Sequence, residues 1–102
     1  MRIKEDLEQL YRDCVEFWGA NRQIRMLQEE CGELIVASSH YLRSRKSGLE
    51  EIIEELADVQ LMVNQIKMFI GEDKVKDVMD IKSDYIKREL EEEKEDAQWN
   101  LK

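Results

Sequence analysis

Apolar residues recur every three or four positions along most of the chain, which is the pattern of amphipathic α-helices. Residues 3 to 17 are expected to form the first helix. Gly19 and Asn21 interrupt the pattern, and Asn21 is expected to cap a second helix that runs to about residue 43. The clearest loop is expected at residues 43 to 48, which are rich in serine and basic residues.

A third and a fourth helix are predicted in the second half of the chain. The segment Ser47–Glu50 fits a capping box, so the third helix is expected to begin near Gly48 and to end at about Ile70. Asp73 is expected to cap the fourth helix. The end of that helix, from about residue 89 to residue 102, is rich in acids and is expected to project into solvent or to fray.

Composition favours the same helical architecture. Charged residues make up 39% of the chain and proline is absent, which suits long uninterrupted helices. We expect a single all-α domain over residues 1–102, folded as a bundle of four to five helices with a modest core. The third helix is apolar around much of its circumference, since Ile53 and Leu61 lie off its main apolar arc. A second copy of the chain is therefore expected to complete the core.

The charge balance restricts the partners. A net charge of −8 argues against free nucleic acid or an anionic membrane as a partner. Residues 1–8 are charged and lack the apolar core of a signal peptide, and no apolar run approaches membrane-spanning length. The two cysteines, Cys14 and Cys31, form neither a disulfide framework nor a zinc-ligand cluster. We therefore expect a cytoplasmic protein with reduced thiols.

Two pairs of carboxylates lie within the apolar faces of the second and third predicted helices. Glu30 and Glu33 form one pair and Glu55 and Asp58 form the other, with the glutamates Glu30 and Glu55 inside the apolar arc and the second acid at its rim. Uncompensated carboxylates facing a core repel one another and destabilise the fold by several kcal/mol. A hard cation such as Mg²⁺, or Mn²⁺, removes that penalty because it prefers oxygen ligands. The alternative is that these acids are solvated surface residues.

An all-oxygen metal site suits phosphoryl chemistry. The only histidine, His40, lies seven residues after Glu33 and lacks the Glu-x-x-His spacing of di-iron bundles, so it is expected at the rim or in packing. No Walker loop, GxSxG elbow or Cys/His nucleophile pair is present. Acids next to the two pairs could accept hydrogen bonds from groups around the site or act as a general base. These acids are Glu29, Glu51 and Glu54.

Residues 17 to 70 resemble the MazG-like nucleoside triphosphate pyrophosphohydrolases. The hallmark of that all-α superfamily is ExxE, a spacer of roughly 12 to 28 residues, and ExxD. Glu30 and Glu33 fill the first half of this motif, and Glu55 and Asp58 fill the second half. The resemblance implies Mg²⁺-dependent cleavage of a nucleoside triphosphate between the α and β phosphates, with the four acids as metal ligands. It also implies a homodimeric or tetrameric helical bundle with its active site between helices.

The resemblance also implies residues that bind the substrate. Trp18 and Gln23 are candidates for the base pocket, the alternative for Trp18 being a place in the core. Gln65 stands seven residues after Asp58, where many relatives have asparagine. Basic residues on the last helix are candidates for holding phosphates, the alternative being that they are solvated. They are Lys82, Lys87 and Arg88.

Two other functions remain open at this stage. One is a non-catalytic helical interaction protein whose acids are solvated or lie at a subunit seam. The other keeps the fold but hydrolyses a different phosphoanhydride. The basic loop at Arg43, Arg45 and Lys46 is expected to be a solvated turn, the alternative being that it approaches a triphosphate tail.

Overall fold

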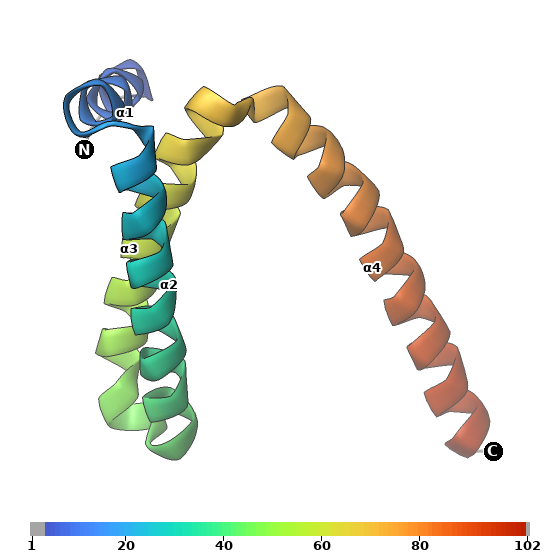
Figure 1. The fold of residues 1–102 in the computed structure, drawn as a ribbon. Helices are drawn as coiled ribbons and strands as arrows, with labels where there is room; N and C mark the ends of the chain where they lie inside the picture. Colours follow the sequence, from blue (N-terminus) through green and yellow to red (C-terminus); the bar gives the residue numbers. More distant parts are fainter. Residues whose placement is uncertain (1–3, 102) are drawn as a thin grey trace. The chain divides into compact units, whose positions relative to one another are not determined.

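The computed structural model describes residues 4 to 101, and this part of the chain is almost entirely helical. The helices are α1 (Lys4–Trp18), α2 (Ala20–Arg43), α3 (Arg45–Ile70) and α4 (Glu72–Leu101) (Figure 1). The predicted all-α fold class is therefore confirmed. None of these helices is long and apolar enough to cross a membrane.

Single residues separate the helices. Gly19 and Gly71 have φ angles of 87° and 134°, backbone conformations that residues with a Cβ rarely adopt. Gly71 thus ends α3 where the sequence predicted it. The expected cap at Asn21 is wrong, because Gly19 occupies the N-cap position and Asn21 lies inside the first turn of α2.

The predicted loop at residues 43 to 48 is wrong as well. Only Ser44 interrupts the helices there, and the backbone N–H of Gly48 already donates a helical hydrogen bond to the carbonyl of Ser44 at 2.9 Å. The capping box is not formed, because α3 begins at Arg45 and Ser47 lies within its first turn. The hydroxyl of Ser47 instead donates to the hydroxyl of Ser44 at 2.8 Å.

Helices α1 to α3 form one unit, in which α2 and α3 run antiparallel and lie side by side along their length (Figure 1). Helix α1 contacts both of them. Its Tyr11 is buried, and the hydroxyl of Tyr11 accepts a hydrogen bond from Asn64 of α3 at 3.4 Å. The apolar core of the described residues is small. Its buried members are Tyr11, Ala37, Met62 and Ile66.

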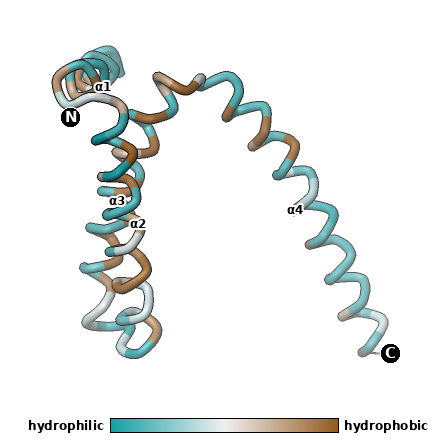
Figure 2. Tube along the Cα trace, in the orientation of Figure 1, coloured by the Kyte–Doolittle hydropathy of each residue, from teal (hydrophilic) through white to brown (hydrophobic). Residues whose placement is uncertain are grey.

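Helix α4 belongs to the second unit. It continues to Leu101 without fraying, and its acidic end is exposed as expected. Apolar positions recur along its first half (Figure 2), yet none of its side chains is buried. Large apolar side chains on this helix are exposed, among them Val78, Met79, Ile81, Tyr85, Ile86 and Leu90. A single domain over the whole chain stays a prediction.

Candidate metal centre

The α2–α3 seam brings polar residues of the two helices face to face. Gln23 and Gln65 are only 2% and 8% exposed, and the Nε2 of Gln23 donates to the Oε1 of Gln65 at 2.6 Å. Glu30 follows Gln23 by two helical turns, and Asp58 precedes Gln65 by two turns. Positions two helical turns apart share a face of a helix. Glu30 and Asp58 therefore face each other two helical turns nearer to Ser44, where α2 and α3 connect.

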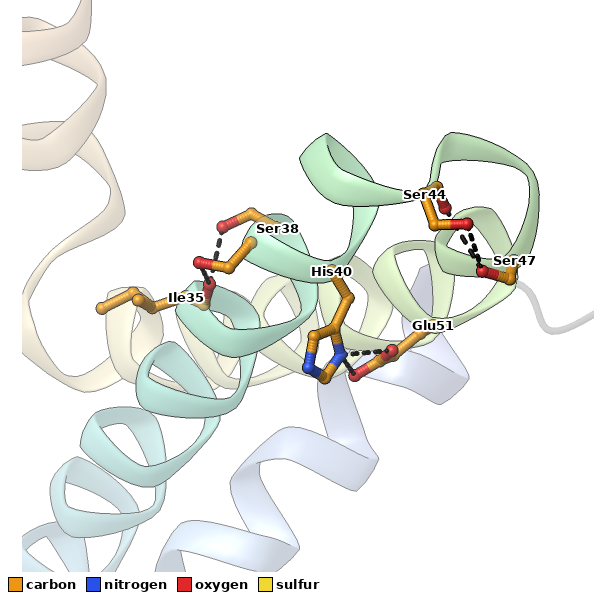
Figure 3. A network of polar contacts seen from close by, with 7 residues as sticks. Ile35, Ser38, His40, Ser44, Ser47 and Glu51 are labelled. Carbon is orange, nitrogen blue, oxygen red and sulfur yellow. Dashed lines mark hydrogen bonds and ion pairs between the residues drawn. The ribbon is translucent and has the colours of Figure 1, made fainter.

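A second polar pair lies nearer the turn at Ser44. The Nδ1 atom of His40 lies 3.0 and 2.9 Å from the two carboxylate oxygens of Glu51 (Figure 3). Both side chains are half-buried. The histidine was expected merely at the rim or in packing, but it bridges the two helices. The carboxylates of the motif therefore lie between a hydrogen-bonded amide pair and a hydrogen-bonded histidine–carboxylate pair.

Three of the motif acids converge in this seam. Carboxylate oxygens of Glu30, Glu55 and Asp58 all lie within 4.8 Å of one another. Glu30 and Glu55 are half-buried, whereas Asp58 and the fourth acid, Glu33, are exposed. This is the arrangement that the helical pattern predicted, with one glutamate of each pair inside and the second acid at the rim.

Burial and mutual repulsion act on the two inner glutamates. Burial raises the pKa of Glu30 above its usual 4.5, and the charges of Glu33, Asp58 and Glu55 raise it further. Burial also raises the pKa of Glu55, and Glu33, Asp58 and the adjacent Glu54 add to the effect. Without a cation, the site therefore favours protonation of its inner carboxylates.

One oxygen of each inner glutamate has no partner. The Oε2 atoms of Glu30 and Glu55 are buried and find no hydrogen-bond partner among residues 4–101. Buried polar atoms are almost always hydrogen-bonded, so these two carboxylate oxygens are free to coordinate a cation. Oxygen donors from carboxylates alone fit a hard divalent cation better than zinc or copper.

A cavity of about 330 Å³ opens beside the acids. Four carboxylates contribute to its wall, so an anionic ligand can enter it readily only if cations offset their charge. Glu54 is exposed on α3 and is not part of this wall, whereas Glu29 and Glu51 are. The lining residues are Glu29, Gly32, Glu33, Val36, Glu51 and Glu55.

No family model, curated protein or solved structure gives a significant match to this chain.

Three other residues were predicted to bind the substrate, namely Trp18, Gln23 and Gln65. Trp18 ends α1, and the two glutamines lie at the end of the seam that is remote from Ser44. Trp18 is 46% exposed; the guanidinium of Arg22 lies 4.5 Å from its ring centroid, and the ring of Phe17 lies edge-on at 5.8 Å. Gln23 and Gln65 are buried against each other, so their hydrogen-bonding groups are engaged within the seam. Their role in substrate binding stays a prediction.

The predicted phosphate-binding residues Lys82, Lys87 and Arg88 all lie on α4, in the other unit. All three are exposed, and the guanidinium of Arg88 lies 4.8 Å from the ring centroid of Tyr85. The four motif acids belong to the first unit, so these basic residues and the acids lie in different units. Their role also stays a prediction.

Proposed function

We propose that this protein is a Mg²⁺-dependent nucleoside triphosphate pyrophosphohydrolase of the MazG-like kind. The observation that carries the proposal is the pair of buried, unpartnered carboxylate oxygens on Glu30 and Glu55, with Asp58 within 4.8 Å. An acidic cluster on a solvated surface would keep its oxygens hydrated, whereas these two are removed from solvent. The spacing of the motif adds the resemblance described above.

In this proposal Glu30, Glu33, Glu55 and Asp58 hold the cation, with Mn²⁺ as a possible substitute. A bound Mg²⁺ supplies charge neutralisation for phosphate oxygens and activation of water. The acids of the cavity wall orient the water, and one of them takes its proton. Glu29 is better placed for that role than Glu54, because only Glu29 lines the cavity. One water is consumed as the α–β phosphoanhydride breaks, which gives a nucleoside monophosphate and pyrophosphate.

We also propose that the active form is a homodimer or tetramer. Ile53 and Leu61, which the sequence placed off the main apolar arc of α3, are 56% and 44% exposed. A core of so few buried apolar side chains is small for a chain of 102 residues. A second copy covering α3 would bury these residues, and we place the assembly in the cytoplasm, where free Cys14 and Cys31 stay reduced.

The test is a panel of standard and modified nucleoside triphosphates with Mg²⁺ or Mn²⁺, in which monophosphate and pyrophosphate are quantified. Glu55→Gln should lower pyrophosphate release by roughly 100-fold or more, because a charge that supports the transition state is lost. Glu50→Gln is the matched control, since Glu50 is an exposed acid on the same helix. It should leave the rate unchanged.

Three results would count against the proposal. Release of orthophosphate with a nucleoside diphosphate would show that a different bond is cleaved. Equal rates for the two variants would show that Glu55 is not part of the site. If the protein has no activity and its melting temperature does not change when Mg²⁺ is added, it would instead be a helical interaction module.

A further inference from the structure

A second cavity lies at the turn between α2 and α3. It has a volume of about 240 Å³, and its wall combines basic and hydroxyl side chains. Glu51 lines this turn cavity and the acidic cavity alike, so the two are neighbours along the seam. The lining residues of the turn cavity are His40, Arg43, Ser44, Ser47, Gly48 and Glu51.

The wall of the turn cavity is far less acidic than that of its neighbour, since it holds one carboxylate and one guanidinium. Its single carboxylate, on Glu51, is engaged by the ring of His40 at 2.9 and 3.0 Å (Figure 3). The guanidinium of Arg43 has no ion-pair or hydrogen-bond partner within the described part of the chain. A free guanidinium beside a carboxylate that is already paired leaves this cavity attractive to anions.

The hydroxyl groups add a donor. Ser47 donates its proton to the Oγ of Ser44 at 2.8 Å, so the hydroxyl of Ser44 keeps its own proton for another acceptor (Figure 3). Gly48 contributes only backbone to the wall. Anionic oxygens of a phosphate are acceptors that suit a guanidinium and a hydroxyl together.

We propose that the turn cavity binds the terminal phosphates of the nucleotide and then holds the leaving pyrophosphate. This inference rests on the proposed function, because it assigns the acidic cavity to the metal-bound part of the same substrate. A triphosphate approaching a chain of net charge −8 meets repulsion over most of its surface. The adjacent turn cavity, with Arg43 in its wall, supplies the local attraction that the acids cannot.

The test is calorimetric titration of inorganic pyrophosphate, with Mn²⁺ present, into the full-length protein and two variants. Arg43→Gln should weaken pyrophosphate binding by roughly tenfold or more, the effect of losing a charge-assisted hydrogen bond. Arg25→Gln is the matched control, because Arg25 is an exposed arginine on the same helix that lines neither cavity. It should bind pyrophosphate as the unmodified protein does.

A nucleoside monophosphate lacks the terminal phosphates, so its affinity should be the same for Arg43→Gln and the unmodified protein. Equal loss of monophosphate and pyrophosphate binding would overturn the proposal, as would unchanged pyrophosphate binding by Arg43→Gln. No detectable binding of pyrophosphate to the unmodified protein would overturn it too.

Failure of the proposed function gives a different pattern. If Glu55→Gln binds Mn²⁺ as tightly as the unmodified protein, the metal centre is wrong, whatever Arg43→Gln does. If the protein hydrolyses no nucleotide but its pyrophosphate affinity still depends on Arg43, the turn cavity remains a phosphate site and only the proposed reaction is lost.

Discussion

Substituting Gly48 tests how closely α2 and α3 approach each other at the turn. A Cβ added at Gly48 would lie 2.6 Å from the Cα and 2.7 Å from the backbone N of Tyr41, and 3.0 Å from the carbonyl carbon of His40. All three are backbone atoms, which cannot rotate aside as a flexible side chain would. The Gly48→Ala variant must therefore push the two helices apart.

The expected magnitude combines two opposing effects. Overpacking of a tight contact destabilises a fold by about 1–3 kcal/mol, and backbone contacts this short belong at or beyond the upper end. Replacing a helical glycine by alanine contributes about 1 kcal/mol in the other direction. We expect Gly48→Ala to lower the free energy of unfolding by about 2 kcal/mol, which corresponds to a melting temperature lower by roughly 8–16 °C.

Gly32→Ala is the matched control, because Gly32 lies inside α2 and an added Cβ there meets nothing within 4 Å. Only helix propensity applies, so this variant should raise the free energy of unfolding by about 1 kcal/mol. Circular dichroism during heating, at one fixed protein concentration, measures both variants. The reasoning about the turn is refuted if Gly48→Ala melts at the same temperature as the unmodified protein or higher.

Two further predictions concern the seam. The raised pKa values of Glu30 and Glu55 stabilise the metal-free fold fully below about pH 4.5, and this contribution is lost as pH rises through the folded-state values. The metal-free melting temperature should therefore fall from pH 4.5 toward neutrality more steeply than that of the double variant Glu30→Gln/Glu55→Gln; parallel curves would contradict this. Gln23→Leu or Gln65→Leu alone should destabilise the fold by about 1–3 kcal/mol, because each removes the partner of one buried hydrogen-bonding group on the remaining amide. Replacing both should cost less than the sum of the two, and strict additivity in urea unfolding would show that the pair is not coupled.

The helices could be predicted from the sequence because they depend on local periodicity. Their number, the break at Gly71 and the inward direction of Glu30 and Glu55 all follow from apolar residues at helical spacing. The connection between α2 and α3 could not be located in this way. Gly48 resembles a helix-start residue in sequence, whereas its structural role is to let the backbones approach.

The His40–Glu51 contact was not predicted from the sequence either. Gln23 and Gln65 lie at equal distance before and after Ser44, whereas His40 and Glu51 lie four and seven residues from it, so counting from the turn does not predict their contact. The assignment of α4 to a separate unit was also beyond the sequence, since an amphipathic helix does not reveal what its apolar face contacts.

The seam shows why its acids are more than solvated charges. Two turns before Glu30, the amide of Gln23 donates a hydrogen bond to the amide of Gln65 at 2.6 Å. Near Ser44, the Nδ1 atom of His40 lies within hydrogen-bonding distance of the carboxylate of Glu51, at 2.9 Å. Only the carboxylates between these pairs keep buried oxygens without a partner in the described residues. In a helical hairpin that pairs its polar groups on either side of the acids, yet leaves oxygens of the acids unpaired, a cation bound as we propose would stabilise the fold, so metal affinity and folding stability would be linked at these same positions.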